Sequence, residues 1–273
     1  MPAAFDLSAI AREIMTAQDE VRLIAPITSR GPGFDLDKGA AVARLIHKAR
    51  VIEGAVPIGR KLGFTNLIMW PRHGMRGPLW AHVYDTTVVD AVDGRATVSL
   101  GRFSQPKIEP EIVLRFHSDA PTNGDPAAVL RCIEWFAPGF EIVQSHCTGW
   151  KFEASDALAD SLLHAALVVG EPQPLDRLGT DPIAALQTFD LALSCDGTVR
   201  DVGKGCNVLG SPLAAVALVA SQIALQTPEN RIRAGEIVTT GTVTAPWPVR
   251  AGETWSATLR GLALPGLEVR FSE

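Results

Sequence analysis

The chain contains 273 residues, of which 47% are hydrophobic, and is therefore long enough to bury one large core. The formal net charge is −5 and the basic residues are scattered. This argues against a nucleic-acid-binding surface, because such a surface needs clustered positive charge. No apolar run approaches the length of a membrane span, so the sequence also argues against an integral membrane protein.

The N-terminus and the cysteines predict the cellular compartment. The opening segment, MPAAFDLSAIAREIM, carries charges of both signs and lacks the uninterrupted apolar stretch of a signal peptide. The four cysteines show no CxxC spacing, so neither a zinc site nor a disulfide framework is predicted. We therefore expect a protein of the reducing cytoplasm.

Two segments near the start are typical of helices. Residues 8–18 carry apolar side chains at helical spacing after Ser8, which can cap the first turn. Residues 37–53 repeat this pattern and are followed by Gly54, a residue type that often ends helices. We expect residues 1–54 to form a helical arm and residues 55–273 to form a β-rich domain.

Short β-rich segments, punctuated by Gly, Pro and Asp, dominate the chain from about residue 55 onwards. The clearest hairpin is predicted in LALSCDGTVRDV, where Asp196 and Gly197 supply the positive φ angles of a two-residue turn. Two later helices are predicted, near residues 126–135 and over residues 211–225, the second with a favourable Ser-Pro start. This pattern predicts an α+β protein with a large mixed-β body.

The segment KIEPEIVLRF, residues 107–116, is the most informative part of the sequence. On a strand, residues two apart point the same way, so Glu109 and Glu111 project from one face. Adjacent carboxylates repel each other unless a cation neutralises them, and such oxygen ligands suit Mg²⁺. A third acid, Glu141, lies between two apolar residues, which is unusual for a surface carboxylate. The alternative is a solvated strand face with an unrelated acid, and Pro110 favours an edge strand in either case.

Two further segments contain candidate site residues. In GRKLGFT, residues 59–65, Lys61 is either part of a solvated surface pair or a partly buried group that binds an anion or donates a proton. In IVTTGTV, residues 237–243, the alternative to an ordinary turn is a carboxylate-binding loop. In that loop the hydroxyl groups of Thr240 and Thr242 would donate hydrogen bonds.

Taken together, these segments resemble the fumarylacetoacetate hydrolase superfamily, and within it the branch of 2-keto-4-pentenoate hydratases and 4-oxalocrotonate decarboxylases. The resemblance extends from about residue 55 to the end of the chain. It is carried by six motifs in the expected order, which are GRKLGFT at 59–65, KIEPEI at 107–112, PGFEIV at 138–143, DALADS at 156–161, GCNVLGSPLAAV at 205–216 and EIVTTGTVTAPWPVRAGE at 236–253.

The resemblance implies a fold and a metal site. The implied fold is a mixed β-sandwich roll around a central metal, preceded here by the short helical N-terminal part. Glu109, Glu111 and Glu141 are the implied ligands of Mg²⁺ or Mn²⁺. In this family the metal chelates the 2-oxo group and one carboxylate oxygen of the substrate, and so acts as a Lewis acid.

The resemblance also implies the contacts of a small 2-oxo acid substrate. Lys61 would lie beside the bound acid as a proton donor or an electrostatic partner. Thr240 or Thr242 would hold the substrate carboxylate. We expect Arg60, next to Lys61 in the chain, to bind the substrate as well.

One departure from the branch concerns proton transfer. The hydratases of the branch have a G-x-L-F-A-D motif, whereas this chain has GPLWAH at residues 77–82, so that His82 replaces the aspartate. His82 is a candidate general acid or base near neutral pH, and Asp85 is a candidate substitute for the missing carboxylate. The alternative is that the proton-handling machinery has been lost or retuned.

We expect a lyase that hydrates a 2-hydroxypenta-2,4-dienoate-like acid to a 4-hydroxy-2-oxo acid. The alternatives, in order, are decarboxylation of a 4-oxalocrotonate-like 2-oxo diacid, C–C hydrolysis of an acylpyruvate, and a non-catalytic partner subunit. Arg72, Arg76 and Arg102 are candidates for binding the second carboxylate of a diacid. The resemblance implies a homodimer or a larger homo-oligomer that can associate with a pathway partner enzyme. No nucleic acid or membrane partner is expected.

Overall fold

The computed structural model describes residues 5–66, 77–226 and 230–273. Nine strands of the described residues form a strongly curved sheet with the order β2-β1-β11-β5-β6-β7-β3, in which β12 also pairs with β5 and β8 with β6. These strands are β1 (Pro57–Gly63), β2 (Leu79–Tyr84), β3 (Val88–Asp90), β5 (Lys107–Phe116), β6 (Ile133–Val143), β7 (His164–Val169), β8 (Gln173–Pro174), β11 (Ile237–Thr239) and β12 (Trp247–Pro248).

This sheet rolls up on itself. Its outermost strands, β2 and β3, lie at opposite ends of the strand order, yet only the short helix η3 (Asp85–Thr87) joins them in the chain. Three residues span at most about 10 Å, so the two edges must meet. We call this meeting point the seam. Side chains then alternate between the inside and the outside of the roll along every strand.

The two faces of the roll have separate apolar cores. The inside holds a small cluster that consists of Val83, Val113, Ala137, Leu167, Val169 and Ile237. The outside belongs to the large core, to which it contributes Ile112, Phe140 and Val168. Each strand therefore alternates between two buried environments, which explains why β5 and β6 are apolar along most of their length.

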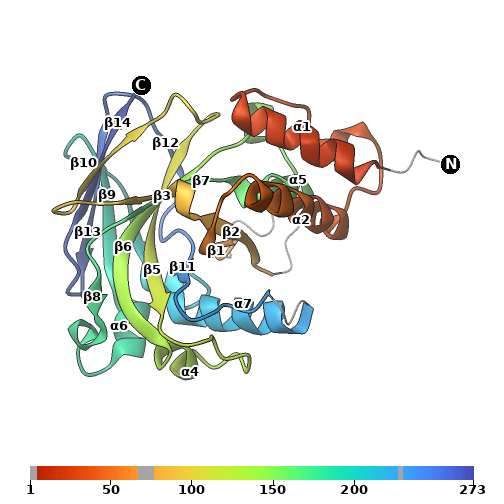
Figure 1. Ribbon diagram of the computed structural model, residues 1–273. Coiled ribbons are helices and arrows are strands. Elements are labelled where there is room, and N and C mark those ends of the chain that lie inside the picture. Colours follow the sequence, from red (N-terminus) through yellow and green to blue (C-terminus); the bar gives the residue numbers. More distant parts are fainter. Residues whose placement is uncertain (1–4, 67–76, 227–229) are drawn as a thin grey trace.

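A second sheet covers the outside of the roll and completes the sandwich, as Figure 1 shows at the left. Its order is β10-β9-β13-β14-β4, and it contributes Leu193, Trp255 and Phe271 to the large core. The strands are β4 (Arg95–Ser99), β9 (Asp190–Cys195), β10 (Thr198–Lys204), β13 (Thr254–Arg260) and β14 (Leu267–Ser272). Three helices pack around the same core, which are α4 (Pro126–Leu130), α6 (Pro182–Thr188) and α7 (Pro212–Gln226).

The N-terminal helices α1 (Leu7–Asp19) and α2 (Leu36–Ile52) lie on the side of the roll away from the second sheet (Figure 1). They share an apolar cluster, which includes Ile14, Val42 and Ile46, with the short helix α5 (Ala154–Ala159). Polar contacts reinforce this packing, because Thr28 donates to Asp156 at 2.6 Å and Gln18 donates to Asp160 at 2.9 Å. The division of the chain at residue 54 stays a prediction.

The predicted fold class, α+β with a short helical N-terminal part, is confirmed. The helices predicted over residues 8–18, 37–53 and 211–225 are present, each within one residue of the expected ends. The predicted hairpin is present, and its turn lies at Asp196 and Gly197, whose φ angles are 49° and 76°. The helix predicted near residues 126–135 is wrong in its second half, because it ends at Leu130 and β6 begins at Ile133. The pairing of β6 with β5 outweighs the weak local helical pattern in this segment.

Pro110 does not mark an edge strand, which corrects the sequence-based expectation. β5 lies inside the sheet, between β6 on one side and β11 and β12 on the other. β11 pairs with β5 up to Val113 and β12 pairs with it up to Ile108, so Pro110 falls in the gap between them. A residue without a backbone N–H is tolerated there, and its carbonyl accepts from Val243 at 3.0 Å.

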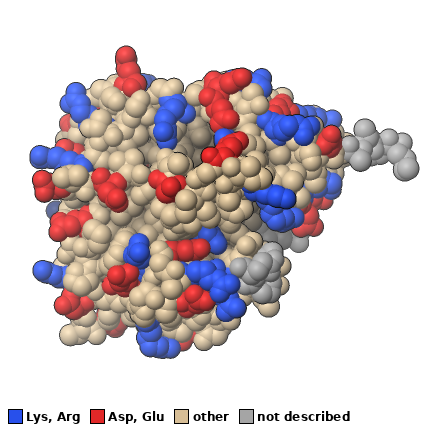
Figure 2. All heavy atoms as spheres, viewed as in Figure 1, with Lys and Arg blue, Asp and Glu red and all other residues tan. Residues whose placement is uncertain are grey.

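The surface matches the charge pattern of the sequence. Figure 2 shows acidic and basic side chains interspersed over the face in view. Among the described residues, no helix is long and apolar enough to cross a membrane.

Candidate metal centre

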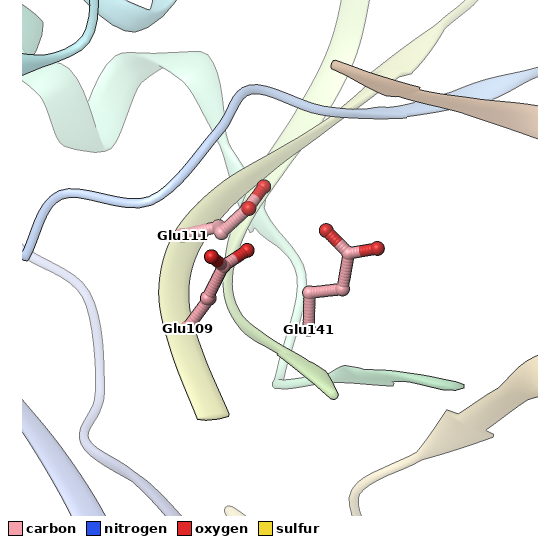
Figure 3. A group of neighbouring side chains, drawn as sticks. All are labelled: Glu109, Glu111 and Glu141. Atoms are coloured by element: carbon pink, nitrogen blue, oxygen red, sulfur yellow. The ribbon is translucent and has the colours of Figure 1, made fainter. Parts of the chain in front are cut away.

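Three glutamates converge inside the roll (Figure 3). Glu109 and Glu111 alternate with apolar residues on β5, and Glu141 lies directly opposite Glu109 on the antiparallel strand β6. One oxygen of each carboxylate lies within 4.8 Å of the others. Glu111 and Glu141 are almost completely buried, so this is not the solvated strand face that the sequence left open.

The hydrogen bonds of the two buried glutamates leave one oxygen of each available. The Oε2 atom of Glu111 accepts from the backbone N–H of Gly241 at 2.8 Å, whereas its Oε1 atom has no partner. The Oε1 atom of Glu141 accepts from Lys61 and from His164, each at 2.8 Å, whereas its Oε2 atom has no partner. Buried oxygens without partners are costly, and a hard divalent cation satisfies both of them at once. The three carboxylates therefore fit a metal such as Mg²⁺ or Mn²⁺.

Electrostatics favour the same conclusion. Burial raises the pKa of Glu109 to about 7 and raises the pKa of Glu111 well above its usual value. The neighbouring carboxylates add to the upward shift of Glu111. Burial also opposes the charged form of Glu141, but Lys61 and His164 lower its pKa overall. Ionising all three carboxylates is thus unfavourable without a further cation, as expected where a metal ion binds.

Lys61 lies on the inner face of β1, across β11 from the glutamates. Its ammonium Nζ is 2.8 Å from Glu141 Oε1, and its side chain is 4% exposed. Burial disfavours the ammonium form, but Glu141, Glu109 and Glu111 together raise the pKa of Lys61. Lys61 is therefore a buried cation of the site, and the surface-pair alternative does not hold for it.

A cavity of about 410 Å³ adjoins the glutamate cluster at Glu109. Lys61 and Thr242 also line it, together with residues from both sheets. Lys107 lies two residues before Glu109 on the same face of β5 and also lines the cavity, with its Nζ 3.8 Å from the centre of the Trp150 ring. The cavity walls thus combine aromatic surface with a second cation.

The loop after β11 contributes through its backbone more than through its threonines. Gly241, with a φ angle of 100°, points its N–H at Glu111, and a side chain at this position would collide with Thr65. Thr242 lines the cavity, although its hydroxyl donates to Thr244 O. Thr240 is buried outside the cavity wall and donates to Ile112 O. Of the two predicted carboxylate donors, the structure brings only Thr242 to the cavity.

Arg60 and His82 lie on the other face of the sheet. They are paired across β1 and β2, just as Lys61 is paired with Ala81, so strand alternation points them out of the roll. Arg60 forms a buried ion pair with Glu236 at 3.2 Å. His82 instead lines a second cavity of about 460 Å³ with His47 and Tyr84, and its ring centre is 3.6 Å from that of His47.

The remaining candidates also lie away from the glutamates. Asp85 is exposed in η3, where its carboxylate accepts from the backbone N–H groups of Val56 and Thr86. Arg102 is exposed beside Phe103. Arg72 and Arg76 lie outside the described residues. The structure therefore brings neither His82 nor Asp85 to the metal centre as a proton-transfer group.

Sequence reasoning missed His164, which contacts Glu141 from β7. The histidines of the sequence show no HxxxH spacing that would single His164 out. The contact depends on the pairing of β6 with β7, where a bulge places His164 opposite Val143. No local motif in the sequence carries that information.

The family model described as fumarylacetoacetate (FAA) hydrolase C-terminal matches residues 80–268. The chain belongs to this family. It is 30% identical to 2-keto-4-pentenoate hydratase 1 of Dechloromonas aromatica over 256 residues, which cover 93% of each chain. It is 27% identical to a 4-oxalocrotonate decarboxylase of a Pseudomonas species, over 86% of this chain and 88% of the relative.

A solved structure agrees with these relatives. The fold matches the 4-oxalocrotonate decarboxylase from Pseudomonas putida G7, complexed with magnesium and adipate, with a TM-score of 0.87. The sequences are 25% identical, and the match covers 97% of each chain. The sequence-based resemblance to this superfamily and to its hydratase and decarboxylase branch is thereby confirmed.

Proposed function

We propose that this chain is a divalent-metal-dependent hydro-lyase that hydrates a 2-hydroxypenta-2,4-dienoate-like acid to a 4-hydroxy-2-oxo acid. The observation that carries this proposal is the group of three inward glutamates with unpartnered oxygens, next to a buried lysine and beside a cavity. Similarity to several 2-keto-4-pentenoate hydratases over more than nine-tenths of the chain supports the reaction.

In this proposal, Glu109, Glu111 and Glu141 hold Mg²⁺ or Mn²⁺. The bound ion would supply Lewis acidity toward the 2-oxo group and one carboxylate oxygen of the substrate. The backbone N–H of Gly241 orients the carboxylate of Glu111 before the substrate arrives. The side chains of Lys61 and His164 do the same for Glu141. Such preorganisation is what a metal site requires of its surroundings.

Lys61 is the proposed proton-transfer residue. Its ammonium group lines the cavity beside the glutamates and stays protonated because they raise its pKa. It can therefore donate a proton to, or stabilise negative charge on, an acid bound above the metal. Thr242 is the proposed contact for the substrate carboxylate, because it lines the same cavity as Lys61.

A specific observation favours decarboxylation of a 2-oxo diacid as the second candidate. Lys107 lies two residues, about 7 Å of strand, from Glu109 on the same strand face and lines the same cavity, which suits a second carboxylate at the far end of a short diacid. The likeness to 4-oxalocrotonate decarboxylases supports the same reading. C–C hydrolysis of an acylpyruvate ranks behind both, and the retained glutamates speak against a purely structural partner subunit.

We further propose that the chain works in the cytoplasm as a homo-oligomer and can associate with a pathway partner enzyme. The resemblance to the superfamily supports this part of the proposal. Light scattering after size-exclusion chromatography measures the oligomer directly. A monomer at micromolar concentration would remove this part of the proposal.

One experiment separates the candidate reactions. The purified protein with Mg²⁺ is mixed with fresh 2-hydroxypenta-2,4-dienoate and, separately, with 2-hydroxymuconate and its oxo tautomer, while dienol absorbance and CO₂ are followed. Loss of the dienoate without CO₂, abolished by a chelator and by Glu111→Gln, supports the hydratase. CO₂ from the diacid moves the assignment to a decarboxylase. If the metal is bound and neither acid is consumed, both reactions are rejected and acylpyruvates are tested.

A further inference from the structure

His164 is buried beside the metal centre and makes one contact with each ring nitrogen. Its Nδ1 is 2.8 Å from Glu141 Oε1, and its Nε2 is 2.9 Å from the hydroxyl oxygen of Thr87. The side chain is 3% exposed. His164 does not line the cavity, so it is not placed to touch a substrate.

The contact with Glu141 fixes the proton on Nδ1. A carboxylate can only accept, so Nδ1 carries the proton that is donated to Glu141. The other nitrogen, Nε2, lies within hydrogen-bond distance of the hydroxyl oxygen of Thr87. The ring is held at both ends and cannot rotate without losing a hydrogen bond.

Thr87 connects this contact to the seam of the roll. It is the last residue of η3, the single turn that joins the two edge strands β2 and β3. Its hydroxyl group also donates to the carbonyl oxygen of Tyr84 at 3.0 Å, and its oxygen accepts from the backbone N–H of Tyr84 at 3.4 Å, at the end of β2. A line of contacts therefore runs from the closure of the roll through Thr87 and His164 to Glu141.

On Glu141, His164 and Lys61 share one oxygen. Both donate to Oε1, and the buried Oε2 is left without a partner. Two donors on one oxygen fix the rotation of the carboxylate, so that Oε2 is the atom presented to the other glutamates. Residues that donate hydrogen bonds to a metal ligand in this way orient the ligand and raise the affinity of the site for the metal.

We propose that His164 is a positioning residue of the metal centre, which holds Glu141 with Oε2 toward the metal and couples this ligand to the seam of the roll. This inference rests on the proposed function, because it requires the three glutamates to bind a divalent ion. It goes beyond that function by assigning a role to a residue that contacts neither the substrate nor the metal.

Mn²⁺ alone is the probe, and its dissociation constant and electron paramagnetic resonance spectrum are the readouts. His164→Ala should weaken Mn²⁺ binding by about 10- to 100-fold, the usual cost of losing a partner behind a metal ligand. Thr87→Val should weaken binding less and alter the spectrum of the bound ion, since it frees the ring but keeps the contact with Glu141. His164→Asn, whose amide can donate to Glu141, should restore part of the loss.

His146 provides a matched control. It is also a buried histidine whose Nδ1 contacts a carboxylate, that of Asp160 at 2.7 Å, but it lies outside the glutamate cluster. His146→Ala should change thermal stability as much as His164→Ala does, while leaving the Mn²⁺ dissociation constant within about twofold of the wild-type value. A role of His164 in folding alone would make the two variants behave alike.

The outcomes separate this inference from the proposed function. If the wild type binds Mn²⁺, Glu111→Gln does not, and His164→Ala binds as well as the wild type, the positioning role is overturned and the proposed function stands. If the wild type does not bind Mn²⁺, both are overturned. Should His164→Ala fail to fold, Thr87→Val decides, and an unchanged affinity and spectrum in that variant would reject the inference.

Discussion

Lys61 and Arg60 are neighbours in the chain but belong to opposite faces of the same strand. On the inner face, Lys61 meets carboxylates whose other oxygens have no partner. On the outer face, Arg60 is paired with Glu236 and lies 5.3 Å from the Trp80 ring centre. Burial lowers the pKa of Arg60 and raises the pKa of Glu236, so the outer pair is an enclosed unit whose charged forms are costly.

The comparison shows that residue type and burial do not by themselves identify a catalytic cation. Both side chains are buried, and both contact an acid. What differs is the number of carboxylates around each cation. Lys61 lies beside a cluster of three glutamates that adjoins a cavity, whereas Arg60 pairs with Glu236 alone, although Arg60 Nε and Glu236 Oε2 also lack partners. The following predictions test this difference between the two faces.

The largest effect is expected from a proposed metal ligand on the inner face. Glu111→Gln keeps the size of the side chain and its contact with Gly241, but it removes a charged ligand oxygen. We expect Mg²⁺ binding in calorimetry and turnover to fall to background. The matched outer variant, Glu236→Gln, should retain both. Equal losses in the two variants would show that the faces do not differ in function.

Next in size is the loss of the inner cation. Lys61→Met keeps most of the length of the side chain and removes the ammonium group. This change should lower kcat by about 10²- to 10⁴-fold, because proton transfer fails. Measured initial rates at saturating metal test this expectation. A variant with wild-type kcat would exclude Lys61 from proton transfer.

Arg60→Met should lower the stability of the fold and leave the chemistry of the metal centre unchanged. It leaves the carboxylate of Glu236 buried without its partner, a change that typically costs about 3 kcal/mol of unfolding free energy. Urea denaturation measures this loss, and metal affinity measured on the folded variant should be unchanged. A large drop in kcat with unchanged stability would instead place Arg60 in the site.

The smallest expected effect concerns the pH dependence of stability on the outer face. Burial, with Arg60 and His47 nearby, lowers the pKa of His82 to about 2 in the folded state. Below about pH 6.5 the unfolded chain binds a proton that the folded chain does not, so stability contributed by His82 falls as pH falls. The difference between wild type and His82→Phe should change by about 1.4 kcal/mol per pH unit in that range.

Urea titrations of both proteins at pH 5 and pH 7 provide the measurement. Other groups also titrate between these values, but they do so in both proteins and cancel in the difference. A difference that does not change with pH would mean that His82 titrates normally and is accessible to solvent.

Strand periodicity allowed much of the site to be predicted. Glu109 and Glu111 were placed on one face because they alternate on a predicted strand, and the structure shows that arrangement. Glu141 was added from its apolar neighbours and from the family resemblance. The register between β5 and β6, which sets it opposite Glu109, depends on pairing that no local sequence pattern specifies.

The candidate residues that lie away from the metal centre were all assigned to it for the same reason. His82 and Arg60 were assigned from their position in motifs, without the strand pairing that decides which face each residue occupies. Thr240 and Thr242 were equivalent in the sequence, and the turn at Gly241 brings only Thr242 to the cavity. His164 was missed for the converse reason, since its contact with Glu141 arises only when β6 and β7 pair.

The apolar cluster inside the roll also has a kinetic consequence. Along the inner face of β5, Lys107 lines the cavity, the glutamates follow, and Val113 begins a plug of packed apolar side chains. In the described part of the chain, one end of the roll is therefore closed behind the metal centre. Substrate and product must then exchange through the same entrance, so a slowly departing product should act as a competitive inhibitor of its own formation.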